Sequence, residues 1–271
     1  MNETGQATSG TGATPRRPLS GRVVIVTGAS SGIGAATARE LGRQGATVVL
    51  AARREADLEA QAQAITQAGG QAIAIPTDLA DEAQIARLVE RTLDAYGRID
   101  VLVNNAGIGS VGWYAKTSEE NIHQLVDVNL LAPMLLTRAV LPGMLERKRG
   151  AIITVASVAG HVAIDPLYSG TKYGLRGFSL SLRRQLRGTG VSVSLVSPGF
   201  IRTSFNRRNG FLMPGPEIVA RAIARLILHS RREVIVPWYY RLGIWAEHLL
   251  PWAADVVLRP RRRRTPREVQ S

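Results

Sequence analysis

Residues 23–34 read VVIVTGASSGIG and join a continuously apolar run to a glycine-rich turn, after which helical spacing begins. A strand has such a run when helices cover both faces of its sheet. Glycines let the backbone approach a pyrophosphate, which the free N–H groups and dipole of the next helix can bind. The spacing differs from G-x-G-x-x-G, and such a turn alone is often only a tight connection. Its place after the first strand of a series favours nucleotide binding by Gly28, Ser30, Ser31, Gly32, Ile33 and Gly34.

The same alternation of apolar runs and helical stretches continues outward from this turn. We expect further strands at residues 47–52, 71–76, 101–104, 151–155, 191–196 and 233–236. Helices are expected at residues 32–44, 56–68, 81–95, 118–141, 168–186 and 216–229. The pattern predicts an α/β protein of right-handed βαβ units, with a doubly wound, mostly parallel sheet of about seven strands, the Rossmann fold.

This organisation predicts a single domain with additions at both ends. Residues 1–20 are Gly/Thr/Ser-rich and are expected to form a flexible leader, since they lack the apolar run of a signal peptide or a membrane span. Residues 21–237 form the predicted Rossmann-fold domain. An aromatic helical extension follows at 238–258, and a basic tail at 259–271.

Composition excludes several classes of site. The chain contains no cysteine, which excludes disulfides, thiolate metal sites and a cysteine nucleophile. We expect no metal site and a cytoplasmic protein. The net charge of +13 includes +5 from residues 259–271, and the basic residues are 31 arginines against 3 lysines. We interpret this arginine bias as a trait of the source genome, so the net charge is weak evidence for nucleic-acid binding. Since no nucleic-acid recognition fold is visible either, we expect no nucleic-acid partner.

The end of the second strand bears on the choice of cofactor. An NAD enzyme usually has an acidic residue there that accepts from the ribose 2′-OH. Here Ala52 is followed by Arg53 and Arg54, whose guanidinium groups can pair with a 2′-phosphate. The alternative is two solvated arginines that open the next helix. The missing acid and the added bases favour NADP(H), with NAD as the second choice.

Residues 151–172 carry the catalytic candidates. Ser157 follows a predicted strand, and Tyr168 and Lys172 lie four apart at the start of a long helix, so the two share one helical face. A neighbouring ammonium favours the phenolate and is expected to lower the pKa of Tyr168. A phenol tuned in this way can exchange a proton with an alkoxide. The Ser157 hydroxyl can donate a hydrogen bond to the same oxygen.

The order and spacing of these motifs resemble the short-chain dehydrogenase/reductase family over residues 21–237. The resemblance rests on TGASSGIG, on Asp78-Leu79 and on Asn104-Asn105-Ala106-Gly107. It also includes Asn129, then Ser157, Tyr168 and Lys172, and finally the run 197–203, SPGFIRT.

The family implies a role for each of these positions. Tyr168 would be the general acid/base, Ser157 would polarise the carbonyl, and Lys172 would bind the nicotinamide ribose. Asn129 would hold a water of the proton relay. Asp78 would contact the adenine, Asn104 the adenosine side, and Ile201 and Thr203 the carboxamide and phosphates. The implied cofactor-binding set is completed by Leu79, Ala106, Gly107, Pro198 and Gly199.

The resemblance and the residues together predict an enzyme that interconverts a carbonyl and an alcohol by hydride transfer with NADP(H). The alternatives are an NAD-dependent alcohol dehydrogenase of the same family and a non-catalytic regulatory or scaffold protein that binds the cofactor. We expect a homodimer or homotetramer. Ser157 and Tyr168 are 11 positions apart, closer than is common in the family, so a relative's substrate does not transfer. An apolar substrate is expected from Phe200, Phe205, Phe211, Leu212 and Met213.

The segment after Pro237 leaves two hypotheses open. It contains Trp238, Trp245 and Trp252 and precedes the arginine run. A spanning helix is opposed by its prolines and charges, namely Pro237, Pro251, Arg241, Glu247 and Asp255. The segment is either a helical extension packed on the core or on another subunit, or residues 238–264 lie on an anionic membrane surface.

Overall fold

The sheet of the computed structural model, which describes residues 17–110, 113–203 and 213–257, has the predicted doubly wound form. Its strand order is β3-β2-β1-β4-β5-β6-β7, and every neighbouring pair is parallel. The strands are β1 (Val23–Thr27), β2 (Thr47–Ala52), β3 (Gln71–Pro76), β4 (Val101–Asn104), β5 (Gly150–Val155), β6 (Val191–Pro198) and β7 (Glu233–Val236). The α/β class and the Rossmann-like fold are confirmed.

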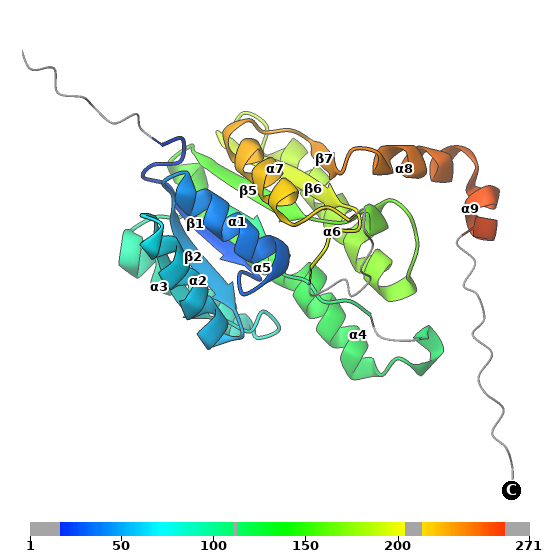
Figure 1. The fold of residues 1–271 in the computed structure, drawn as a ribbon, viewed down its shortest axis with the longest axis horizontal. Coiled ribbons are helices and arrows are strands. Elements are labelled where there is room, and N and C mark those ends of the chain that lie inside the picture. The colour runs from blue at the N-terminus through cyan, green and yellow to red at the C-terminus, as the bar shows by residue number, and fades with distance from the viewer. Residues whose placement is uncertain (1–16, 111–112, 204–212, 258–271) are drawn as a thin grey trace, which may run out of the picture.

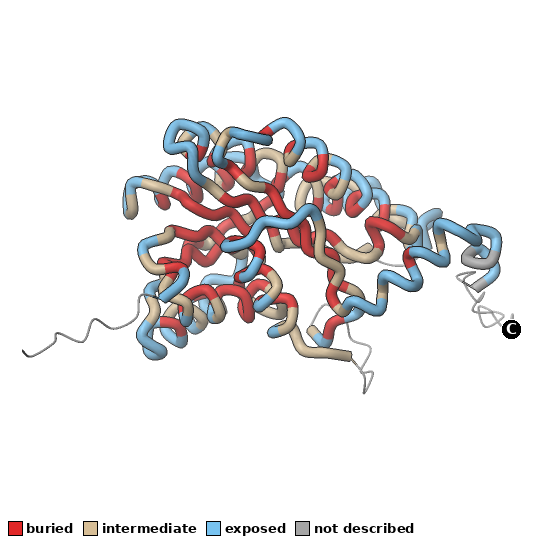
Figure 2. The backbone as a smooth tube through the Cα atoms, turned by 90° about the horizontal axis from the view of Figure 1, so that it is seen from above, coloured by how far each residue is buried: buried red, intermediate tan, exposed pale blue. Residues whose placement is uncertain are grey.

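Helices cover both faces of this sheet, which forms the buried layer in the middle of the molecule (Figures 1 and 2). One face packs against α1 (Gly32–Arg43), α2 (Glu55–Gln67) and α7 (Glu217–Leu228). The other packs against α3 (Glu82–Tyr96), α5 (Ala132–Glu146) and α6 (Pro166–Gln185). Because Val24 and Val26 face the first layer and Val23 and Ile25 the second, four consecutive positions of β1 are apolar.

The crossover connection from β6 to β7, which contains α7, does not have the expected right hand. The helix α7 lies on the same face as α1 and packs against it. However, the step from β6 to β7 runs across the sheet in the direction opposite to the step from β1 to β2. Two crossovers on one face that run in opposite directions have opposite hands, so the expectation of right-handed units throughout is wrong.

The helix expected over residues 118–141 is interrupted. The structure has α4 (Glu119–Val126), a π-helical turn η2 (Asp127–Leu131) and then α5, which continues to Glu146. Inside η2, Asn129 accepts a hydrogen bond from the N–H of Ile108 at 2.8 Å and donates one to its carbonyl at 2.9 Å. A π-turn inside a helix is often found at a functional site. Here it brings the Asn129 amide to the loop after β4.

The continuous helical segment Glu119–Glu146 is long and apolar enough to cross a membrane by length and composition. It is the one such segment among the described residues. Of the most apolar 18-residue stretch of this segment, 44% is buried inside the protein. Leu136, Val140 and Met144 pack in the core under the sheet, so this burial explains the apolar composition.

The ends of the domain differ from the predicted boundaries. Residues 17–20, assigned to the leader, belong to the packed domain, since Leu19 is fully buried and its N–H donates to the carbonyl of Gln44. After β7 the predicted extension is helical, but it is broken into α8 (Tyr240–Leu249) and α9 (Pro251–Val257), which project from the body (Figure 1). Residues 1–16 and the basic tail lie outside the described residues.

Candidate active site

The glycine-rich turn leaves no room for side chains at two positions. A Cβ atom at Gly34 would lie 2.1 Å from the carbonyl oxygen of Gly28. Gly28 itself has φ +65°, and a Cβ there would lie 2.9 Å from the Cα of Ala106. Glycine alone meets both demands. The turn therefore exposes the N-terminus of α1 to a ligand beside the loop after β4.

Thr27, a residue that the sequence analysis did not single out, fastens this turn to β4. Its Oγ1 accepts from the backbone N–H groups of Asn105 at 2.9 Å and Ala106 at 3.0 Å. In return, Nδ2 of Asn105 donates to the carbonyl of Thr27 at 2.8 Å. The two strands on either side of the point where the strand order reverses are thus joined at their carboxyl ends, where ligands bind in this fold.

A cleft of about 780 Å³ opens at these carboxyl ends. It gathers residues from loops that are far apart in the sequence, and most of the predicted site residues line it. These are Gly28, Ser30, Ser31, Gly32, Ile33, Gly34, Arg53, Arg54, Asp78, Leu79, Ala106, Gly107, Ser157, Tyr168, Lys172, Pro198, Gly199, Ile201 and Thr203.

Two predicted residues lie behind the cleft wall. Asn104 is buried and its Nδ2 donates to Thr137 Oγ1 at 3.2 Å on α5, so its side chain does not line the cleft, and its contact with the adenosine side stays a prediction. Its neighbour Asn105 lines the cleft instead. Asn129 is also buried and donates to Thr171 Oγ1 at 3.3 Å. Its predicted role as the holder of a relay water stays a prediction.

The catalytic candidates are placed by two capping interactions. Ser157 follows β5 and caps the short helix η3 (Val158–Gly160), and its Oγ accepts from the N–H of Ala159 at 3.0 Å. Asp165 caps α6 and accepts from the N–H of Tyr168 at 2.7 Å. These caps bring the hydroxyl groups of Ser157 and Tyr168 into hydrogen-bonding contact.

Lys172 lies one helical turn after Tyr168 and is almost fully enclosed, with 3% of its surface exposed. Its Nζ is 5.7 Å from the centre of the Tyr168 ring and donates to the Val155 carbonyl at 3.4 Å. No ion pair of Lys172 occurs within the described parts of the chain. Burial without a carboxylate partner lowers the pKa of Lys172 to about 8.

The expected lowering of the pKa of Tyr168 is not found in this protein. Burial raises the pKa of Tyr168 above its ordinary value, the hydrogen bond with Ser157 opposes this rise, and the charge of Asp165 adds to it. The desolvation of the phenolate therefore dominates, and Tyr168 is held in its protonated form at neutral pH.

The end of β2 presents two arginines to the cleft. Arg54 donates to Ser30 Oγ of the glycine turn at 3.1 Å and pairs with Asp57 at 2.9 Å. Arg53 is exposed and lines the same cleft. Arg54 is thus fixed beside the glycine turn, and the edge of the cleft at this point is basic.

A largely enclosed cluster around Glu233 connects the loops of the site and was missed by the sequence analysis. Glu233 Oε1 accepts from Ser197 Oγ at 2.6 Å and lies 2.6 Å from His161 Nε2. Its Oε2 accepts from Arg176 Nε at 3.1 Å. The partners come from β6, from the loop between Ser157 and Tyr168, and from α6. Burial alone would raise the pKa of Glu233, but the hydrogen bonds from His161 and Ser197 and the charges of His161 and Arg176 lower it to about 2.

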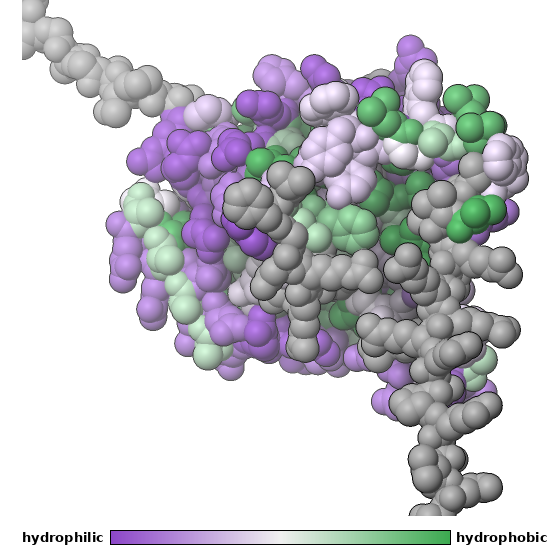
Figure 3. Space-filling view, turned by 45° about the vertical axis from the view of Figure 1, so that its right-hand side comes forward, coloured by the Kyte–Doolittle hydropathy of each residue, from purple (hydrophilic) through white to green (hydrophobic). Residues whose placement is uncertain are grey.

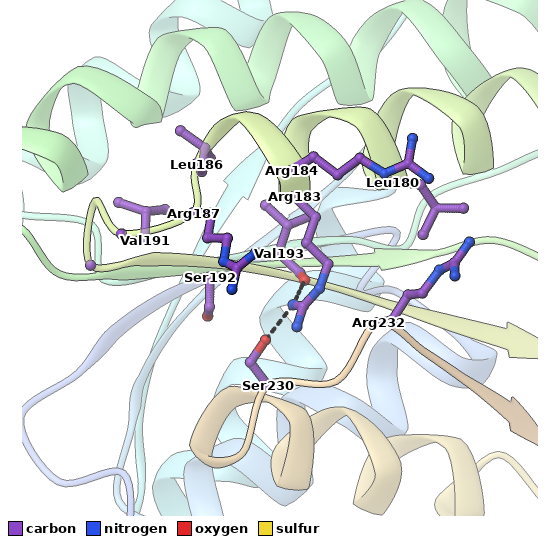
Figure 4. A pocket seen from close by; sticks show the side chains of 12 residues that line it. Leu180, Arg183, Arg184, Leu186, Arg187, Val191, Ser192, Val193, Ser230 and Arg232 are labelled. Carbon is purple, nitrogen blue, oxygen red and sulfur yellow. Dashed lines mark hydrogen bonds between the residues drawn. The ribbon is translucent and has the colours of Figure 1, made fainter.

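A second cavity of about 590 Å³ lies away from the cleft, where α6 ends and β6 begins. Arg184, Arg187 and Arg232 line it, and Arg183 donates to the Val193 carbonyl and to Ser230 Oγ (Figure 4). Since Val191 starts β6, this cavity is at the amino end of the strands. Ligands of this fold bind at the carboxyl ends, so the cleft and not this cavity is the candidate active site.

Comparison with known proteins identifies the family. A sequence model described as short chain dehydrogenase matches residues 22–210, a range that includes the glycine turn, Ser157, Tyr168 and Lys172. The chain belongs to the short-chain dehydrogenase/reductase family. It is similar to ketoacyl reductase HetN of Nostoc sp., with 41% identity over 227 residues that cover 80% of this chain and 79% of that protein. It is also similar to 3-oxoacyl-acyl-carrier-protein reductase of Synechocystis sp., with 40% identity over 68% of this chain and 76% of that one.

Solved structures agree with this assignment. A metagenomic short-chain oxidoreductase in complex with NADP matches with a TM-score of 0.72 and 41% identity, over 80% of this chain and 97% of that chain. A dehydrogenase/reductase from Sinorhizobium meliloti matches with a TM-score of 0.74 and 29% identity, over 82% and 95%. The protein is therefore an oxidoreductase of the short-chain family.

Replacing the largely enclosed carboxylate, Glu233→Gln, is expected to lower the free energy of unfolding by roughly 1.5–3 kcal/mol at pH 7, the range for hydrogen bonds to a charged group. Because the pKa of Glu233 is about 2 in the folded state and near 4.5 when unfolded, this stabilisation is present above about pH 4.5. It is lost as the pH falls toward 2. Urea titrations across this range measure it, with the exposed Glu90→Gln as control. A stability difference independent of pH would contradict the assignment.

Replacing the buried lysine, Lys172→Met, is expected to stabilise the protein. Met conserves the volume and removes the cost of burying an ammonium. With the pKa of Lys172 lowered from its ordinary 10.5 to about 8, we expect the free energy of unfolding to rise by roughly 1–3 kcal/mol at pH 7. The gain should shrink between pH 8 and 10.5, since the wild type is stabilised as its folded form loses the proton first. Thermal denaturation compares it with the exposed Lys116→Met; destabilisation would contradict the interpretation.

Proposed function

We propose that the protein is an NADPH-dependent reductase that converts the keto group of an apolar or acyl substrate to an alcohol. The same enzyme can also catalyse the reverse reaction. The observation that carries this proposal is the meeting of Ser157, Tyr168 and Lys172 in one cleft with the glycine turn. Two adjacent hydroxyls beside a dinucleotide cradle fit the transfer of a hydride and a proton to one carbonyl.

The residues of the cleft fit a dinucleotide phosphate. Side chains are excluded at Gly28 and Gly34, so the backbone of the turn can contact a pyrophosphate directly. Arg53 and Arg54 stand at the end of β2, where a 2′-phosphate is distinguished from a 2′-hydroxyl. The solved relative in complex with NADP supports the same preference. The alternative of an NAD-dependent enzyme lacks the acidic residue that it would need after Ala52.

A bound NADPH supplies the hydride that adds to the carbonyl carbon, and the chain supplies the proton. Tyr168 donates its phenolic proton to the carbonyl oxygen as negative charge develops there. Ser157, in hydrogen-bonding contact with Tyr168, can donate to the same oxygen. The raised pKa of Tyr168 keeps the phenol protonated, and so able to donate, at neutral pH. An intact donor set also argues against a non-catalytic scaffold.

Apolar side chains around the reacting position favour an apolar substrate. Ile108, Val158, Ile164 and Phe200 line the cleft beside the catalytic residues. Of the residues that suggested this substrate from the sequence, Phe205, Phe211 and Leu212 lie outside the described residues, and Met213 is half-buried. The two relatives named for ketoacyl reduction make a ketoacyl thioester the first compound to assay.

Removing the proton donor, Tyr168→Phe, is expected to lower turnover with NADPH by about two orders of magnitude or more. The dissociation constant for NADPH should change little, because the glycine turn is intact. Steady-state assays with a series of ketoacyl thioesters and ketones, together with a fluorescence titration of NADPH, measure the two quantities. Tyr173→Phe, on the exposed side of the same helix, is the control. Near-normal turnover of Tyr168→Phe with every accepted substrate would contradict the mechanism.

The cofactor preference is tested at the end of β2. Arg53→Ala is expected to weaken NADPH binding by roughly 1.5–3 kcal/mol, as for a lost hydrogen bond to a charged group, and to leave NADH binding nearly unchanged. Arg91→Ala, an exposed arginine on α3, controls for the change in net charge. Titration of both cofactors gives the result; equal losses for NADPH and NADH would show that Arg53 does not recognise a 2′-phosphate.

A further inference from the structure

The extension formed by α8 and α9 exposes an apolar surface. Leu242, Trp245 and Leu249 are 67%, 67% and 72% exposed, and their spacing places them along one side of α8. Trp238, Trp252 and Val256 continue this exposure on either side. We call these six side chains the apolar stripe. Figure 3 shows hydrophobic and aromatic side chains gathered on the side of the molecule that carries the extension. An exposed apolar patch of this kind marks a docking surface.

The opposite side of α8 fixes the extension to the domain. Ile244 is buried, and the ring of Tyr240 lies so close to Gly199 that a Cβ there would be 2.2 Å from it. The hydroxyl of Tyr240 accepts from the N–H of Phe200 at 3.2 Å. Gly199 and Phe200 both line the cleft. The apolar stripe is therefore held at a defined place, next to the loop at the mouth of the candidate active site.

The charge that follows the stripe indicates what covers it. Residues 259–271 hold six arginines and one glutamate, so the chain leaves the extension with a strong positive charge. A second copy of the chain would carry the same positive charge and would offer these arginines no complementary charge. A surface of anionic lipid attracts the arginines and accepts the apolar side chains, and tryptophan favours the boundary between headgroups and acyl chains.

We propose that the apolar stripe docks reversibly on an anionic membrane surface. The helices α8 and α9 contain 10 and 7 residues, whereas crossing a bilayer takes about 20, so the extension lies on the membrane without spanning it. Stable but reversible attachment to a membrane requires two contributions. Here they are the burial of the apolar side chains in the lipid and the attraction of the basic residues to its anionic headgroups. The mouth of the cleft is then next to the lipid. Delivery of an apolar substrate from the membrane rests on the proposed function, but lipid binding does not.

Sedimentation of the full chain with vesicles tests the proposal without an enzyme assay. We expect binding to vesicles of phosphatidylcholine with about one third phosphatidylglycerol at low salt, and much weaker binding to pure phosphatidylcholine. Each basic residue near the surface adds about a fivefold factor, which fades as salt shortens the Debye length. The absence of binding to anionic vesicles, or equal binding to both compositions, would overturn the proposal.

Variants locate the contact on the extension. The triple variant Leu242→Gln/Trp245→Gln/Leu249→Gln should weaken binding by at least about tenfold with an unchanged thermal midpoint, because these side chains are exposed. Trp245→Gln and the equally exposed Trp113→Gln form a matched pair, of which only the first should weaken binding. Equal losses for the pair, or a triple variant that binds like the wild type, would place the contact elsewhere and overturn the proposal.

Two further measurements distinguish a membrane from a second copy of the chain as the partner that covers the apolar stripe. The tryptophan fluorescence of the wild type should shift to the blue when anionic vesicles are added, and this measurement needs no variant to fold. The mass in solution should be the same for the wild type and the triple variant. A lower mass for the triple variant, with no fluorescence shift of the wild type, would show that the stripe is a subunit contact.

Discussion

The close approach of Gly34 to the carbonyl oxygen of Gly28, where a single added carbon would lie at 2.1 Å, is the constraint on which the site depends. It lets the chain turn from β1 into α1 within a few residues and leaves the first N–H groups of the helix free for an anion. The Oγ1 of Thr27 then holds the loop after β4 against this turn by accepting hydrogen bonds from two backbone N–H groups. Every other cleft residue is placed relative to this junction by the parallel sheet, which brings the ends of its strands to one edge.

Two enclosed charged groups of the site, Glu233 and Lys172, affect stability in opposite ways. Glu233 is surrounded by three partners and its pKa is lowered, so it stabilises the junction of β6, α6 and the loop before α6. Lys172 has a backbone carbonyl as its partner and its pKa is lowered as well, which for a lysine means that the charged form is disfavoured. A buried charge that lowers stability is typical of a functional position, because such groups are retained for their chemistry.

The sequence predicts the sheet well because its signal is local. A strand covered on both faces is apolar along most of its length, and β2, β3, β4 and β7 have the predicted bounds. The turn and the catalytic residues are equally visible, since glycine spacing and the Tyr168–Lys172 pair are short-range patterns. Their arrival in one cleft follows from the parallel sheet.

What the sequence does not predict depends on contacts between distant residues. The π-turn contains Asn129, which hydrogen-bonds to Ile108, 21 positions away. The neighbours Asn104 and Asn105 have the same side chain, and only packing against α5 decides which of them faces the cleft. The pKa of Tyr168 rises because the surrounding protein desolvates the phenolate. The partners of Glu233 lie 36 to 72 positions from it.

The central claim, hydride transfer from NADPH to a carbonyl, is tested most directly with cofactor deuterated at the transferring position of the nicotinamide. Incubation of the full chain with this cofactor and a ketoacyl thioester, followed by mass spectrometry of the product, follows the label. The account predicts an alcohol that carries one deuterium on the former carbonyl carbon, formed faster with NADPH than with NADH. A product without deuterium, or no reduction of any carbonyl compound with either cofactor, would contradict it.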